Sequence, residues 1–203
     1  MIREFNDVSS TILATCLSQE GITITHANTF KASFDIENRV LTIPSTKFSV
    51  DKDVTIALTL HEVGHALYTG IEYGAAQKEH KIPKQLINIV EDIRIEKLIK
   101  RKYKGASRVM IKSALKLFKE GLFGTPEEIA EYTGLDLVNI YYKCGSGCGL
   151  KLPSIYKDVY PAIDKMETME DVIEVCLTLM KENATEDEEK DDSGEEESKN
   201  EVP

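Results

Sequence analysis

The chain has 203 residues, of which 41% are hydrophobic and 30% charged, so it is long enough for one domain with a buried core. Its opening residues lack the basic start and apolar run of a signal peptide, and no stretch approaches the ~18 apolar residues of a membrane-spanning helix. Four cysteines, Cys16, Cys144, Cys148 and Cys176, are too sparse for a secreted disulfide framework. We therefore expect a soluble protein of the reducing cytoplasm.

The net charge of −10 is concentrated at the C-terminal end. Residues 185–203 carry ten acidic residues against Lys190 and Lys199, and nothing apolar lies between Ala184 and Val202. Such a segment repels itself and has no apolar surface with which to offset the entropy of ordering. We predict a folded domain over residues 1–184 and a disordered acidic tail over residues 185–203.

The first predicted elements are strands. The β-rich pieces KASFD (31–35) and RVLTIP (39–44) are separated by three residues that include Asn38, which is typical of a hairpin. The preceding ITIT (22–25) is a candidate third strand. The N-terminal part is therefore expected to form a small sheet.

Helices are predicted to follow. From about Asp51, apolar residues recur at helical spacing as far as His65, and a second helix is expected after Pro83. A third helix covers SRVMIKSALKLFKEG and ends at Gly121. Thr125 with Glu128, and Thr168 with Asp171, have the spacing of capping boxes. The order of elements predicts an α+β fold, in which a small sheet packs on a mostly helical body.

The predicted first helix contains the sequence HEVGH. Residues four apart on a helix face the same way, so His61 and His65 can ligate one ion and Glu62 can reach a water beside it. Zinc lowers the pKa of its water from 15.7 to roughly 7, and a carboxylate can then take the proton. The longer metzincin pattern is absent, because Tyr68 and Ile71 replace its glycine and third histidine. The open alternative is a chance pattern in a buried helix.

A catalytic zinc needs a third protein ligand, and three residues are candidates. His80 lies in a polar stretch before a proline, where a solvated loop histidine is the simpler interpretation. Glu91 lies beside the apolar stripe of the next helix, where a buried carboxylate needs a partner such as a metal. Asp92 is rotated by about 100° from Glu91 and could instead hold a ligand histidine or pair with a basic side chain. We predict Glu91 as the third ligand.

Two segments together resemble a known family. With HEVGHALYTG and NIVEDIRIEKLIKRKYKGA, the chain is similar over roughly residues 40–120 to a phage-encoded metallopeptidase-like family related to the N-terminal part of cobalt chelatase subunit T and similar VWA-domain proteins. The resemblance rests on LTIPSTKF before the first motif and EDIRIE after it. It implies a zincin-like fold and a gluzincin-like site, with His61, His65 and Glu91 on zinc and Glu62 as base. It also implies the cytoplasm of a phage host, and a VWA or AAA-type ATPase partner.

The leading hypothesis is a zinc endopeptidase that binds its polypeptide substrate as an extended strand along the edge of RVLTIP. The alternative is a non-catalytic module in which zinc holds the helices together for assembly with a VWA or AAA-type ATPase. Nucleic-acid binding through KLIKRKYKGASR is a weaker reading, because most such runs are solvated helix ends and the acidic tail would oppose it.

Three further features have no assigned role. Tyr68, Tyr73 and Tyr103 lie near the motifs and could stabilise an oxyanion, although packing is the more common role of such tyrosines. Cys144 and Cys148 form a CxxxC pair, a weak metal or redox candidate without a second pair of ligands nearby in sequence. Gly64 lies inside the motif helix, where glycine costs about 1 kcal/mol relative to alanine, which predicts close packing there.

Overall fold

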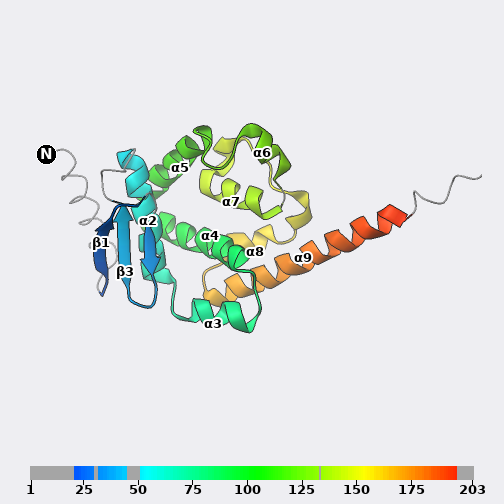
Figure 1. Cartoon of the computed structure of the whole chain (residues 1–203), viewed down its shortest axis with the longest axis horizontal. Coiled ribbons are helices and arrows are strands. Elements are labelled where there is room, and N and C mark those ends of the chain that lie inside the picture. Colours follow the sequence, from blue (N-terminus) through cyan, green and yellow to red (C-terminus); the bar gives the residue numbers. More distant parts are fainter. Residues whose placement is uncertain (1–20, 30–31, 45–50, 133, 196–203) are drawn as a thin grey trace, which may run out of the picture.

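The computed structural model describes residues 21–29, 32–44, 51–132 and 134–195, with side chains described as far as Glu182. It confirms the α+β class: a three-stranded sheet lies at one end of a mostly helical body (Figure 1). Cys16 lies outside the described residues.

The sheet has the order β1-β3-β2, with β1 at Thr23–Ala27, β2 at Ser33–Asp35 and β3 at Val40–Pro44. Strands β2 and β3 form the predicted antiparallel hairpin. The Asp35 carboxylate closes its turn by accepting hydrogen bonds from the backbone and side-chain nitrogens of Asn38.

Strand β1 pairs with β3 in parallel, from Thr23 opposite Val40 to Ala27 opposite Pro44. The third strand predicted from ITIT is therefore present, and its position changes one expectation. Strand β3 is the central strand, so the prediction that a substrate adds to a free RVLTIP edge is wrong. The sheet edges are β1 and the short β2.

The helices begin with α2, whose N-cap residue Asp51 accepts a hydrogen bond from the Asp53 backbone nitrogen. Both predicted capping boxes are present, with Thr125 at the start of α6 and Thr168 before α9. The helices of the described chain are α2 (Lys52–Tyr68), α3 (Glu72–Glu79), α4 (Lys84–Lys102), α5 (Lys104–Lys119), α6 (Pro126–Glu131), α7 (Gly134–Cys144), α8 (Tyr160–Lys165) and α9 (Met169–Glu195), with 3-10 turns at Gly145–Cys148 and Ser154–Tyr156.

Two clusters of buried apolar side chains hold these elements together. The sheet-side core joins the sheet to α2, α4 and α5, and it includes Leu41, Ile43, Val63 and Ile99. The α9-side core joins α4 to α7, α8 and α9. Helix α4 contributes to both cores and runs through the middle of the body (Figure 1). The buried side chains of α4 are therefore fixed by packing in both cores.

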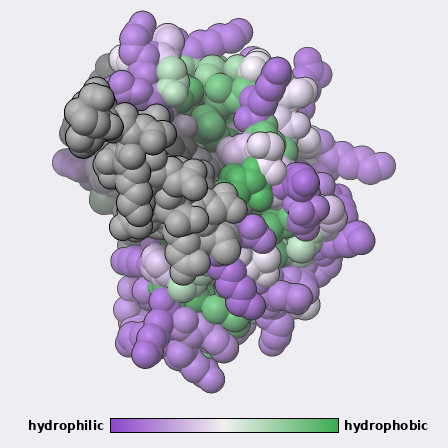
Figure 2. All heavy atoms as spheres, turned by 90° about the vertical axis from the view of Figure 1, so that its right-hand side faces the viewer, coloured by the Kyte–Doolittle hydropathy of each residue, from purple (hydrophilic) through white to green (hydrophobic). Residues whose placement is uncertain are grey.

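Helix α9 projects beyond the body (Figure 1), and its backbone continues to Glu195, into the segment for which the sequence predicts disorder. Residues 196–203 lie outside the described part. The face at this end of the molecule is largely hydrophilic, with hydrophobic residues exposed between the charged ones (Figure 2). Among the described residues, no helix is both long and apolar enough to span a membrane.

Candidate metal centre

His61 and His65 lie one turn apart on α2, as the motif predicts. Their ring centroids are 5.0 Å apart and the rings are nearly perpendicular. Both side chains are about four-fifths buried, with 18% and 20% of their surface exposed. The two imidazoles thus face one shared space that solvent still reaches.

Asp92 on α4 faces both histidines. Its Oδ1 atom lies 3.6 Å from His61 Nε2 and 3.3 Å from His65 Nε2. A ligand atom from each of the three residues lies within 4.8 Å of the others, close enough for one ion to contact all three. Two imidazole nitrogens and one carboxylate oxygen are a donor set that suits zinc and leaves a fourth position for water or substrate.

The other ring nitrogen of His61 is also held. Nδ1 lies 3.1 Å from Glu96 Oε1, and a carboxylate only accepts hydrogen bonds, so Nδ1 carries the proton. Nε2, the atom that faces Asp92, is then the nitrogen through which the neutral ring would bind a metal. This is the carboxylate–histidine arrangement that orients metal ligands in proteins.

His65 is oriented through an intermediate hydroxyl. Thr69 Oγ1 donates its proton to Glu91 Oε1 at 2.5 Å, so it can only accept from His65 Nδ1, which lies 3.0 Å away. Nδ1 of His65 therefore carries a proton, and Nε2 is the nitrogen through which the neutral ring would bind a metal. Both histidines present the same nitrogen to the shared space.

Glu91 does not lie in that space. Its side chain is fully buried, and its carboxylate is held by the Arg94 guanidinium at 2.7 and 2.8 Å and by the Thr69 hydroxyl. The prediction of Glu91 as third ligand is therefore not supported by the geometry, which places Asp92 there. The partner that a buried carboxylate needs is Arg94, and Arg94 also donates to the backbone oxygens of Tyr68 and Glu167.

Glu62 is buried beside the two histidines on α2. Among the described residues its carboxylate has no hydrogen-bond partner, in contrast to Glu91 and Glu96. Burial raises its pKa above the ordinary value, and the neighbouring histidines oppose that shift. The side chain is thus uncommitted, as the role of proton acceptor requires.

Lys143 on α7 pairs with two carboxylates of the site, those of Asp92 and Glu96. Its Nζ lies 3.2 Å from Asp92 Oδ2 and 3.1 Å from Glu96 Oε1. Burial alone would raise the pKa of Asp92, but the two histidines and Lys143 outweigh it and lower that pKa to about 2. Because Lys143 takes Oδ2, Asp92 keeps Oδ1 for the histidines. Lys143 lies 51 residues after Asp92, and no local sequence pattern could have revealed it.

Gly64 sets the distance between the two helices that carry the donors. A Cβ atom at Gly64 would lie 3.1 Å from Ile95 Cδ1 and 3.2 Å from Ile99 Cγ1. The close packing predicted from this glycine is therefore present, against side chains of α4. Glycine lets α2 approach α4, so that His61 and His65 come within reach of Asp92.

A largely apolar cavity of about 210 Å³ borders the candidate metal centre at His61. Its apolar lining comes from α2, α5 and the turn after α5, while one end is polar. The lining residues are Val54, Ala57, Leu58, His61, Glu96, Met110, Ser113, Ala114, Leu117, Leu122, Phe123 and Lys143.

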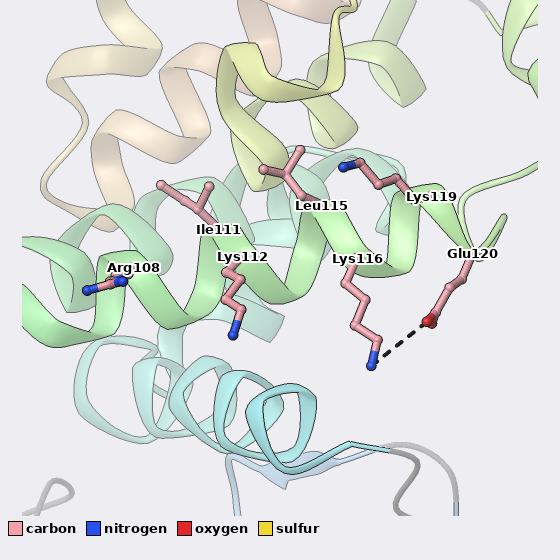
Figure 3. Close-up of a pocket in the computed structure, with 7 residues that line it drawn as sticks. All are labelled: Arg108, Ile111, Lys112, Leu115, Lys116, Lys119 and Glu120. Carbon is pink, nitrogen blue, oxygen red and sulfur yellow. Dashed lines mark ion pairs between the residues drawn. The ribbon is translucent and has the colours of Figure 1, made fainter.

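A second, more open hollow follows α5 and is lined by Arg108, Ile111, Lys112, Leu115, Lys116, Lys119 and Glu120, none of which belongs to the metal centre (Figure 3). Its cations are partly neutralised, because Lys112 pairs with Asp53 and Lys116 with Asp51 and Glu120.

The remaining histidine and tyrosine candidates lie outside the donor group. His80 is exposed at the end of α3, as expected for a solvated histidine. Tyr68 and Tyr103 pack against the sheet-side core, and the Tyr73 hydroxyl donates to Asn88. Burial raises the pKa of Tyr73 to about 12, so this hydroxyl keeps its proton at neutral pH.

The cysteine pair and the basic run are also accounted for locally. Cys144 is buried, burial raises the pKa of its thiol to about 11, and Cys148 donates to a backbone oxygen. Neither belongs to the metal-binding group found among the described residues. In the basic run, Lys97, Lys100 and Arg101 bond to Asp164, Glu96 and Glu167 of this same chain.

Comparisons of the chain with protein-family models, with curated proteins and with solved structures gave no match. The metallopeptidase-like resemblance carried by the two motifs therefore stays a prediction.

Proposed function

We propose that the protein is a zinc-dependent peptidase whose metal is held by His61, His65 and Asp92. The observation that carries the proposal is the convergence of three donor atoms beside an uncommitted buried glutamate. When bound, zinc supplies Lewis-acid chemistry: it polarises a carbonyl group and acidifies water. Residues of this chain orient the ligands, hold their charges and transfer the proton.

Glu96 and the Thr69–Glu91 pair hold the two Nδ1 atoms, so that both Nε2 atoms are aimed at the shared space where they would bind the ion. Lys143 keeps Asp92 ionised and holds the oxygen that does not face the histidines. Glu62 takes the proton from the attacking water and returns it to the leaving amine. The burial of Glu62 keeps bulk water from competing for that proton.

The direct test is Glu62→Gln, with Glu79→Gln on the exposed surface of α3 as the matched control. We expect Glu62→Gln to bind zinc stoichiometrically but to lose roughly 100- to 10,000-fold in peptide hydrolysis, because it removes a proton acceptor and no ligand. The control should match the wild type in both. Zinc content by mass spectrometry and cleavage of a peptide library measure the two effects, and undiminished turnover by Glu62→Gln would contradict the mechanism.

One observation favours a second candidate, a zinc-stabilised assembly module without catalysis. The donors come from two helices, and α4 packs in both cores, so an ion would clamp the domain. This candidate requires that chelation lower the melting temperature while the zinc-loaded wild type cleaves no peptide of the library. The partner implied by the resemblance, a VWA or AAA-type ATPase, would then be the relevant ligand. A structural site, however, has no need of Glu62.

A further inference from the structure

The cavity beside the metal centre has two chemically different ends. Its body is lined by apolar side chains such as Leu58, Met110 and Leu117, whereas His61, Glu96 and Lys143 form its polar end. His61 is also a member of the donor group. The cavity therefore adjoins the donor group at His61, the residue that the two have in common.

The volume suits one bulky side chain. An apolar cavity of about 150 Å³ is enough to bind benzene, and this one measures about 210 Å³. An aromatic or branched aliphatic side chain would displace any water from a site that offers it few polar partners. A charged side chain would lose its hydration against the apolar wall without a matching ion, because Lys143 and Glu96 are already paired with each other.

We propose that this cavity is the specificity pocket of the enzyme and that it receives a large apolar side chain of the polypeptide substrate next to the scissile bond. The inference rests on the proposed peptidase function, because it takes the metal centre as the place of reaction. A larger side chain at Ala114 of α5 would fill the pocket. Ala114 lines the cavity and lies on a helix that carries none of the donors.

The test separates binding from cleavage. Binding is measured by fluorescence anisotropy with zinc-loaded Glu62→Gln protein and labelled peptides that differ only in carrying Phe, Leu, Ser or Asp at one position. Cleavage of the same peptides is measured with wild-type protein. We expect Phe and Leu peptides to bind more tightly than the Ser peptide by roughly 10- to 200-fold, the range that hydrophobic pockets achieve.

Ala114→Leu should remove that preference while zinc content stays unchanged, whereas Ala75→Leu on the exposed surface of α3 should leave it intact. If Ala114→Leu does not fold, Leu117→Ala provides the opposite change, and the enlarged pocket should shift the preference toward Trp. If either Ala114→Leu or Leu117→Ala leaves the peptide preference unchanged, the cavity is not the specificity pocket, even if the peptides are cleaved. Selective, Ala114-dependent binding without cleavage by wild type supports the pocket and contradicts the peptidase. Absence of both binding preference and cleavage contradicts both.

Discussion

Asp92 and Glu91 are neighbours on α4 whose carboxylates have different partners. Asp92 faces the two histidines, while Glu91 is buried against Arg94. We expect Asp92→Asn to lose zinc and to cost the metal-free protein less stability than a change at Glu91, because Asp92 is partly exposed and Lys143 keeps Glu96 as a partner. Glu91→Ala should instead destabilise the fold by about 3–5 kcal/mol, because it leaves a buried guanidinium without its counter-charge.

Metal analysis and denaturant unfolding of the two chelated variants distinguish these effects. If Glu91→Ala lost zinc while its apo form unfolded like the wild type, Glu91 rather than Asp92 would be the ligand. The sequence favours Glu91 as the ligand, because Glu91 adjoins the apolar stripe of α4. The assignment depended on a rotation of about 100° around the helix and on Arg94 and Lys143, whose positions only the tertiary structure fixes.

Thr69 joins His65 to Glu91 through its hydroxyl. Thr69→Val keeps the shape of the side chain but cannot accept the Nδ1 proton, so the His65 ring loses its fixed tautomer. We expect zinc affinity to fall about 10- to 100-fold, as is usual when such an outer partner is removed. The matched control is Thr59→Val, a buried threonine within α2 whose hydroxyl donates to the Thr55 backbone oxygen and not to a residue of the candidate site. Competition with a zinc indicator measures both, and equal affinities would remove Thr69 from the site.

At the scale of elements, the site depends on how closely α2 approaches α4. Gly64→Ala would gain about 1 kcal/mol of helix propensity, but its Cβ would lie 3.1 Å from Ile95 and 3.2 Å from Ile99, and these fully buried side chains would have to shift within a packed core. Overpacking of this kind typically costs about 1–3 kcal/mol. We expect a net loss of stability together with weaker zinc binding, because the donors are pushed apart. Thermal unfolding and zinc titration test this, and a variant that is more stable and binds zinc normally would refute it.

The elements themselves were largely predictable, and their pairing was not. Helical periodicity predicts α2, α4 and α5, and the three-residue connection that includes Asn38 predicts the β2–β3 hairpin. These signals are local, because each depends on residues a few positions apart. The parallel pairing of β1 with β3 joins segments that are adjacent in space only after folding. For that reason RVLTIP was expected at an edge and lies in the centre.

At the scale of the whole molecule, we expect the acidic end of the chain to be separable from the folded body. Among the side chains that the structure describes, which reach Glu182, the last one packed on the α9-side core is that of Met180, and the ten acidic residues begin after it. Deletion of residues 185–203 should therefore leave melting temperature and zinc content nearly unchanged. Any partner bound by this segment should be lost on deletion and should dissociate as salt rises. Calorimetry, metal analysis and pull-down at two salt concentrations test this, and loss of the fold or of zinc would show that the segment packs on the domain.

The position of α4 in both cores has a consequence for the dynamics of the domain. A bound ligand stabilises a protein against those openings that destroy its binding site. It has no effect on openings that leave the site intact. Because the two histidines lie on α2 and Asp92 on α4, the sheet-side core cannot open between these helices without breaking the donor group, whereas α8 and α9 can separate from α4 with both donor helices in place. Zinc would therefore protect backbone amides against hydrogen exchange in the sheet half more than in the α9 half, and the difference between the halves would show that the two cores open separately.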